Sequence, residues 1–152
     1  IGTVEDEKAL NIEKIRYQNK LLVLIDVPEE LHAYTIPKLT LQPLIENAII
    51  HGFHNSLNEV IITVTADSDE KSIILHIKDN SGGIPDEIMD NINHWNPSDD
   101  SEKNLSGCSG VGLVNIQKRL RLTYGNNYGI TIQKNNKGGT HILIQIPKRS
   151  DL

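Results

Sequence analysis

Three separated segments of the chain carry residue types that could do chemistry together. They read QPLIENAIIHG (42–52), DNSGGIP (79–85) and SGVGLVN (109–115). The first combines an amide with an imidazole, the second places an acid beside glycines, and the third places glycines around a valine. An amide oxygen can ligate Mg²⁺, a carboxylate can accept a hydrogen bond from the amine of a base, and glycine-rich backbone can approach a phosphate. Together these segments indicate a nucleotide-binding site.

Asp79 is the most informative single residue. It shares the strand phase of Leu75 and Ile77, so the alternation of a strand turns it toward the core. Burial of a carboxylate is unfavourable unless donors surround it, and the exocyclic amine of adenine is a suitable donor. The alternative is an aspartate that only caps the following turn, which Gly82 and Gly83 make.

Asn47 and His51 stand at helical spacing, so a helix places them on one face. The amide oxygen of Asn47 could bind a Mg²⁺ ion that bridges phosphates, and His51 could contact phosphate or ribose. Taken singly, each residue also fits a structural role, as a helix-terminal amide or a hydrogen-bonded core histidine.

Gly110 and Gly112 bracket Val111 at the point where a helix is expected to begin. The free N–H groups and the dipole at such an end attract phosphate. A GxG sequence alone is often only a tight turn, and its weight here comes from the other two segments.

Hydrophobic periodicity predicts the elements that must hold these segments. Helices are expected at 4–19, about 40–52, 86–92 and 111–124, and strands at 21–27, 60–66, 73–79, 130–133 and 140–146. A short turn separates strands 60–66 and 73–79, which predicts an antiparallel hairpin. Because strands and helices do not alternate regularly, we expect an α/β (α+β) two-layer sandwich, with a mixed, mostly antiparallel sheet and helices on one face.

The segment from about 84 to 110 has a different composition. Beyond residue 92 it is polar and rich in Asn, Ser, Asp and Gly, and it is long for a passive connection. Such a segment is either a mobile lid or disordered. Trp95 within it is expected to anchor the lid or to contact a partner.

The composition argues against several other classes of function. A net charge of −5 disfavours a nucleic-acid-binding surface, which needs clustered Lys and Arg. Cys108 is the only cysteine, so an internal disulfide and a Cys-based zinc site are excluded. No apolar run approaches the roughly 18–20 residues that span a bilayer. We expect a soluble chain, cut from a longer, membrane-bound parent.

The three segments resemble those of the ATP-binding domain of sensor histidine kinases, within the wider group that includes gyrase, a major heat-shock chaperone and MutL ATPases. The N box of that group matches ENAIIHG, its first glycine box DNSGGIP and its second glycine box SGVGLVN. The LytS/YesM-type kinases are more similar still, through IPKLTLQPLIENAIIHG, GVGLVNIQKRLRLTYG and GGTHILIQIP. The resemblance covers nearly the whole chain.

This resemblance implies a Bergerat-type fold that binds Mg-ATP under a flexible lid. Asn47 would hold Mg²⁺, and the candidate catalytic residues are Asn47, His51 and Glu46. The expected nucleotide contacts are Asn47, His51, Asp79, Gly83, Ile84, Gly110, Val111, Gly112, Leu113 and Thr140. Ser81 departs from the usual DxGxG pattern at its first glycine, and we expect local rearrangement there rather than loss of binding.

The resemblance also implies a reaction and its partners. The domain would donate the γ-phosphoryl group of ATP to a histidine on an upstream helix, because none of the six histidines here has the sequence setting of a phosphoacceptor. That helix would belong to a dimeric parent kinase, a response regulator would follow, and no contact with nucleic acid or membrane is expected. Residues 1–19 would end a helical linker, and residues 20–152 would form the ATP-binding domain, in the cytoplasm of a bacterium with a membrane-anchored parent kinase.

Two other functions stay open on the sequence. One is an ATPase of the same group or an anti-sigma-type serine kinase, whose relatives carry a glutamate one helical turn before the asparagine. Pro43 occupies that position here and argues against hydrolysis, while Glu46 is adjacent to Asn47 and points about a quarter-turn away. The other is a binding module that keeps the fold without the nucleotide, which Ser81 alone favours.

Overall fold

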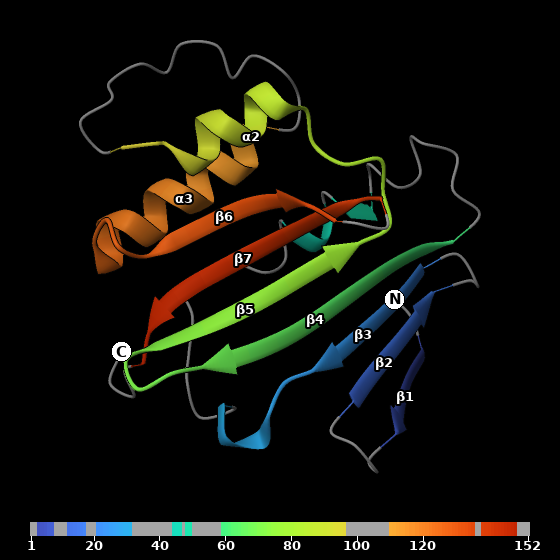
Figure 1. Cartoon of the computed structure of the whole chain (residues 1–152). Coiled ribbons are helices and arrows are strands. Elements are labelled where there is room, and N and C mark those ends of the chain that lie inside the picture. Colours follow the sequence, from blue (N-terminus) through green and yellow to red (C-terminus); the bar gives the residue numbers. More distant parts are fainter. Residues whose placement is uncertain are drawn as a thin grey trace.

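The computed structural model describes residues 3–7, 12–17, 21–31, 44–46, 48–49, 59–96, 110–135 and 138–148. Seven strands in this part of the chain form one sheet with the order β1-β2-β3-β4-β5-β7-β6 (Figure 1). They are β1 (Thr3–Glu7), β2 (Ile12–Tyr17), β3 (Leu21–Asp26), β4 (Val60–Ser68), β5 (Ser72–Asp79), β6 (Gly129–Lys134) and β7 (Thr140–Pro147). The β3–β4 pair is parallel, and the other five pairs are antiparallel. The predicted mixed, mostly antiparallel sheet is therefore confirmed.

The longer helices of the described part lie at the β6 end of this sheet (Figure 1). They are α2 (Asp86–Asn93) and α3 (Gly110–Tyr124), which pack on each other and on β6, and α3 also contacts β7. A short 3₁₀ helix, η1 (Glu29–Leu31), follows β3, and residues 44–46 and 48–49 are helical, within the helix expected at about 40–52. None of the helices in the described ranges is long and apolar enough to cross a membrane.

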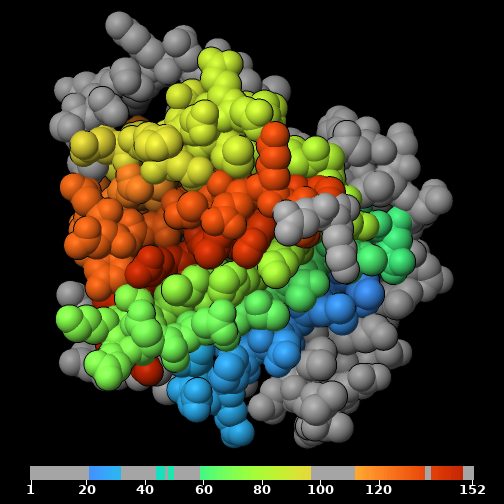
Figure 2. Space-filling model, viewed as in Figure 1, coloured from blue at the N-terminus to red at the C-terminus, as the bar shows by residue number. Residues whose placement is uncertain are grey.

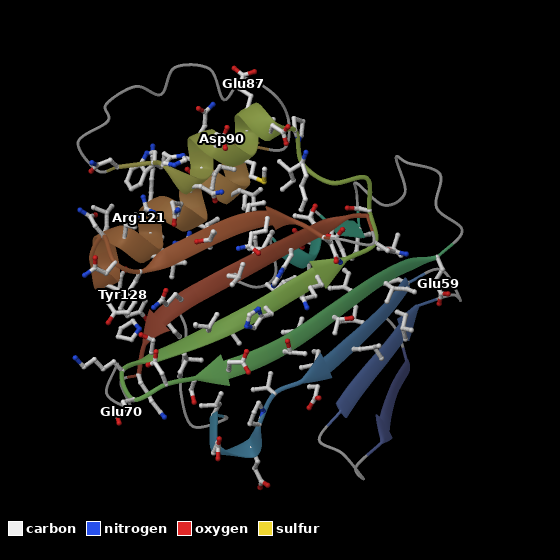
Figure 3. All side chains as sticks on the ribbon, in the orientation of Figure 1. Glu59, Glu70, Glu87, Asp90, Arg121 and Tyr128 are labelled. Carbon is white, nitrogen blue, oxygen red and sulfur yellow. The ribbon has the colours of Figure 1, made fainter. Side chains whose placement is uncertain are left out.

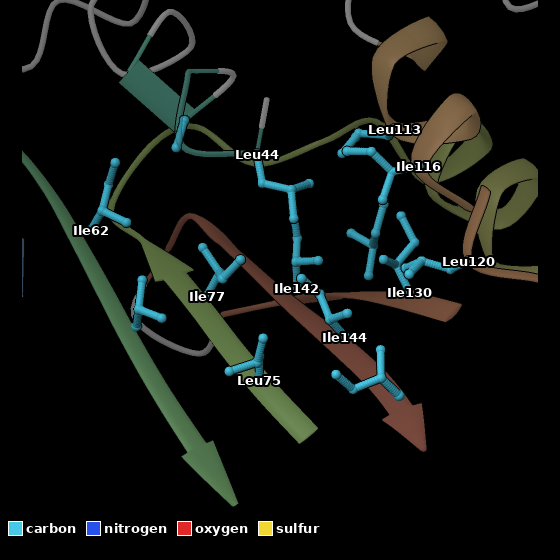
Figure 4. Close-up of a cluster of buried hydrophobic side chains, with 14 of the residues drawn as sticks. Leu44, Ile62, Leu75, Ile77, Leu113, Ile116, Leu120, Ile130, Ile142 and Ile144 are labelled. Carbon is cyan, nitrogen blue, oxygen red and sulfur yellow. The ribbon is translucent and has the colours of Figure 1, made fainter. Parts of the chain in front are cut away.

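The core lies between the helices and one face of the sheet. Side chains alternate along a strand, so β4 buries Val60, Ile62 and Val64 while Ile61 and Thr63 are partly exposed. The helices contribute to the same cluster Leu44, Leu113, Ile116 and Leu120 (Figure 4). The buried hydrophobic side chains of the described residues are Ile, Leu, Val and Ala, as the aromatic content of 4% requires.

The N-terminal segment differs from the prediction. A helix is expected at 4–19, but the structure has β1 and β2 there, so the helix prediction is wrong. β2 pairs with β3, and β1 pairs with β2. The outer edge of β3 would otherwise present a row of unpaired N–H and C=O groups, and β-branched residues such as Val4, Ile12 and Ile15 favour strands. The same strands contradict the prediction that residues 1–19 end a helical linker.

Two side-chain amides hydrogen-bond to the outer edge of β6, whose only neighbour in the described sheet is β7. Gln117 of α3 is fully buried; its Nε2 donates to the carbonyl of Ile130 at 2.9 Å, and its Oε1 accepts from the N–H of Ile130 at 2.7 Å. Asn93, at the end of α2, makes the same pair of bonds with Ile132, at 2.9 and 2.7 Å. These amides stand in for a neighbouring strand and attach both α2 and α3 to the edge of the sheet.

The opposite face of the sheet is turned to the viewer in Figure 2, where β4, β5 and β7 form diagonal bands. It carries a chain of polar side chains from three strands. The Nε2 of His76 lies 3.0 Å from the carboxylate of Asp67, and the Nδ1 of His76 lies 3.0 Å from the Nε2 of His141. Because a carboxylate accepts, His76 donates from Nε2 and accepts at Nδ1, and neutral His141 is then the donor.

Candidate functional site

Asp79 is the last residue of β5 and is 7% exposed. Its register partner is Ile62 of β4, and Leu75 and Ile77 of its own strand are buried on the same face. The sequence prediction that Asp79 faces the core is confirmed. A buried carboxylate at this position requires hydrogen-bond donors.

Two neighbouring residues supply donors to the Asp79 carboxylate. The Oδ1 atom accepts from the backbone N–H of Ser81 at 2.8 Å, from the Ser81 hydroxyl at 2.5 Å, and from the backbone N–H of Thr140 at 3.3 Å. Ser81 and Thr140 are themselves 5% and 3% exposed. Ser81, which departs from the glycine pattern, is therefore a partner of the site's acid.

Gly139 brings the start of β7 against the end of β5. Its φ is +90°, and a Cβ built at this position would lie 2.0 Å from the carbonyl oxygen of Asp79. Gly83 has a φ of +86°, and a Cβ there would lie 3.6 Å from the carbonyl oxygen of Gly139. Gly83 of the first glycine box thus lies against Gly139, and Gly139 lies against the backbone of Asp79, both in backbone conformations that other residues rarely adopt.

Asn80 holds the same turn from the β4 side. Its Nδ2 donates to the carbonyl of Glu59 at 3.0 Å, and its Oδ1 accepts from the N–H of Ile61 at 2.8 Å. Glu59 is labelled at this end of the sheet in Figure 3. The dipeptide Asp79-Asn80 is thus tied to β7 by its first side chain and to β4 by its second. The sequence analysis did not identify Asn80, because its partners are backbone atoms distant in the chain.

The second glycine segment forms the start of α3, which begins at Gly110, one residue before the predicted position. The first turn of α3 contains no acidic residue, so no carboxylate of that turn offsets the positive end of the helix dipole. The Leu113 side chain is buried in the core and Ile84 is half-buried against it. Leu113 could therefore meet a ligand through its backbone N–H rather than its side chain.

The helix that carries the N box is described in part. Leu44 and Ala48 are buried in the same cluster as Leu113, and Glu46, between them in sequence, is exposed. Asn47 and His51 lie outside the described residues. The burial of Leu44 and Ala48 shows that one face of this helix packs on the core.

The predicted lid at about 84–110 is described at its two ends. Trp95, just beyond α2, packs partly buried against the core, and the Nζ of Lys118 lies 5.9 Å from the centroid of its ring. This favours the interpretation of Trp95 as an anchor of the lid. Residues 97–109 lie outside the described part of the chain.

A surface cavity of about 420 Å³ lies elsewhere, at the opposite end of β5. It is lined by Asp69, Glu70, Lys71, Ser72, Asn127, Tyr128 and Gln145. Glu70 and Tyr128 are labelled at this end in Figure 3, away from Glu59. None of the predicted site residues that the structure describes lines this cavity.

Solved structures share this fold. The catalytic domain of the histidine kinase ThkA superimposes with a TM-score of 0.56, at 14% identity over 85% of this chain and 79% of that chain. The ATP-binding domain of PrrB from Mycobacterium tuberculosis gives a TM-score of 0.52, at 15% identity over 86% of this chain and 82% of that one. At such low identity, the likeness establishes the fold alone.

Curated relatives are similar at the level of sequence. The sensor histidine kinase YesM of Bacillus subtilis is 31% identical over 100% of this chain and 25% of its own length. BtsS of Escherichia coli is 32% identical over 93% of this chain and 22% of its own length. The sensor protein LytS of Streptococcus agalactiae is 30% identical over 97% and 25%. The chain thus spans about a quarter of the length of these relatives.

A family model also matches most of the chain. It is described as histidine kinase-, DNA gyrase B-, and HSP90-like ATPase, and it matches residues 35–150, which include the three segments and the GT sequence at Thr140. The chain belongs to this family.

Proposed function

We propose that this chain is the Mg-ATP-binding catalytic domain of a two-component sensor histidine kinase. Membership of the family implies ATP binding. The observation that supports an adenine site is the buried carboxylate of Asp79, which receives its hydrogen bonds on Oδ1 from Ser81 and Thr140. The second carboxylate oxygen is then an acceptor for the exocyclic amine of adenine.

The remaining predicted residues would hold the rest of the nucleotide. Backbone groups of Gly83 and Ile84 would border the base, with Thr140 supporting the pocket from β7. The phosphates would lie at the N-terminus of α3, where Gly110, Val111, Gly112 and Leu113 present N–H groups. These assignments rest on the positions of the residues at the ends of β5 and α3.

Asn47, His51 and Glu46 complete the proposed site. Asn47 would hold Mg²⁺, whose charge, when bound, neutralises the phosphate oxygens. His51, on the same helix face, would contact phosphate or ribose. Glu46, which is adjacent to Asn47 and exposed, is the third candidate catalytic residue.

The proposed reaction is in-line transfer of the γ-phosphoryl group to a histidine nitrogen. For such a transfer a protein contributes positioning and charge stabilisation rather than covalent chemistry. A lid at about 84–110 would close over ATP and exclude water. The acceptor helix would lie upstream in a dimeric parent, a response regulator would receive the phosphoryl group, and the domain would work in the cytoplasm of a membrane-anchored bacterial kinase.

Titration calorimetry tests the proposed site. The wild-type chain should bind ATP more tightly with Mg²⁺ than without it, and should bind GTP weakly. Asn47→Ala should abolish the effect of Mg²⁺ and keep adenine selectivity, whereas Asp79→Ala should lose adenine selectivity and keep the effect of Mg²⁺. Unchanged ATP binding in both variants would contradict the assignment, and wild-type protein that does not bind ATP would contradict the proposed function.

A further inference from the structure

We infer that Ser81 is a positioning residue that determines base specificity: its hydroxyl holds the Asp79 carboxylate in the orientation that selects adenine. This inference rests on the proposed function. Ser81 stands where the sequence pattern of the family has a glycine, which has no side chain to offer. Here the serine faces the acid and is not turned to solvent, since it is only 5% exposed.

Ser81 contacts the Asp79 carboxylate with both its backbone and its side chain. Ser81 donates twice to the same carboxylate oxygen, from its N–H at 2.8 Å and from its hydroxyl at 2.5 Å. Hydrogen bonds to a carboxylate oxygen are about twice as strong as those between neutral groups. The third bond to Oδ1, from the N–H of Thr140, is longer at 3.3 Å.

The direction of these bonds matters because a carboxylate rotates about its last side-chain torsion with only a broad preference. All three bonds that the described residues donate to Asp79 end on Oδ1, and none of them ends on Oδ2. Within the described part of the chain the carboxylate is therefore held through Oδ1, and Oδ2 is the oxygen left to accept from a ligand. Loss of the hydroxyl would leave one short backbone bond and one long one to define this orientation.

A fixed acceptor distinguishes between purine bases. Adenine offers an amine that can donate to Oδ2, whereas a base with a carbonyl at the same position would place two acceptors against each other. Selectivity of this kind depends on a buried polar group that has no other partner when the wrong base is bound. A carboxylate that can rotate would discriminate less between adenine and other purine bases.

The test compares ATP with inosine triphosphate, which has a carbonyl in place of the amine. Ser81→Ala should weaken ATP binding about tenfold, the scale of one hydrogen bond to a charged group. Binding of inosine triphosphate should change little, so the Kd for inosine triphosphate divided by the Kd for ATP should fall. A purely structural role of Ser81 would weaken both nucleotides alike, and an unchanged ratio would overturn the inference.

Two further variants isolate the Asp79 carboxylate as the group through which Ser81 acts. Added to Asp79→Ala, Ser81→Ala should have no further effect on either Kd, because effects within one interacting pair are not additive. Ser81→Cys keeps the size of the side chain and weakens the donor, so it should lower the ratio as Ser81→Ala does, and it serves if the alanine variant folds poorly. Additive losses in the double variant would overturn the inference.

Ser68→Ala is the matched control, because Ser68 is exposed at the far end of β4. It should leave both Kd values at their wild-type levels. Wild-type protein that binds neither nucleotide would overturn the proposed function and this inference with it. Wild-type protein that prefers ATP, with the same preference in Ser81→Ala, would overturn the inference alone.

Discussion

The backbone of Asp79 lies so close to Gly139 that replacing this glycine by alanine tests the contact. Gly138 and Gly139 are adjacent and have φ values of +85° and +90°. A Cβ at Gly138 would meet nothing within 4 Å, whereas a Cβ at Gly139 would lie 2.0 Å from the carbonyl oxygen of Asp79. The two glycines therefore share a backbone conformation that would strain any other residue, and they differ in the space around them.

We expect Gly138→Ala to lower the free energy of unfolding by about 1–2 kcal/mol, the cost of a left-handed conformation. Gly139→Ala should lower it by roughly a further 1–3 kcal/mol, because the end of β5 must move away from β7. Urea unfolding of the two variants measures the difference, and ATP titration should show weaker binding in Gly139→Ala alone. Equal losses of stability would contradict the close approach.

At this scale the sequence predicted part of the site. The alternation of apolar residues along β5 was enough to predict that Asp79 faces the core. Gly83 of the first glycine box has a positive φ, which glycine adopts readily. Ser81 and Asn80 were not identified as partners, because their roles depend on hydrogen bonds. A pattern of residue types contains no information on which atoms meet when distant strands come together.

Among the elements, β6 shows how an edge strand can be closed by helices. Gln117 bonds both backbone groups of Ile130 and also donates to the carbonyl of Ile92, at 3.0 Å. Asn93 bonds both backbone groups of Ile132. Since α2 lies in the first part of the predicted lid (about 84–110) and α3 begins at its end, these amides fix both parts to one strand.

Gln117→Leu tests this attachment. A leucine has nearly the same size but leaves the N–H and C=O of Ile130 without their partner, so we expect a loss of about 2–4 kcal/mol in the free energy of unfolding. Gln133→Leu is the control, because Gln133 lies exposed on the same strand. Unfolding in urea measures both variants, and a loss in Gln117→Leu no larger than in Gln133→Leu would rule out the attachment.

The elements themselves were predicted with uneven success. Strands with long alternating patterns, such as β4, β5 and β7, have nearly the expected bounds, and α3 begins one residue early. The prediction of a helix at 4–19 was wrong, since β1 and β2 occupy residues 3–7 and 12–17. Whether a segment with few apolar residues becomes a strand depends on a sheet edge that needs a partner, and that edge exists only in the folded molecule.

On the scale of the whole molecule, the sheet separates two environments. One face packs on the helices and ends at Asp79, while the other carries the chain of Asp67, His76 and His141. Burial lowers the pKa of His141 below its ordinary value of 6.5, and the charges of Lys78 and His76 lower it further. The rings of His76 and His141 lie close, with centroids 5.2 Å apart, so each imidazole lies within reach of the other's charge.

The sign of the resulting pH dependence follows from linkage. Between pH 6.5 and the lower pKa of His141 in the folded protein, the unfolded chain binds a proton that the folded chain does not. The free energy of unfolding should therefore be fully retained above about pH 6.5 and fall as the pH drops below it. His141→Gln should flatten this slope, and Lys78→Gln should reduce it in part, because it removes only one of the charges that disfavour protonation. Urea unfolding between about pH 5 and 7.5 measures the slopes; a His141→Gln variant with the wild-type slope would mean that this imidazole does not couple the open face of the sheet to the stability of the domain.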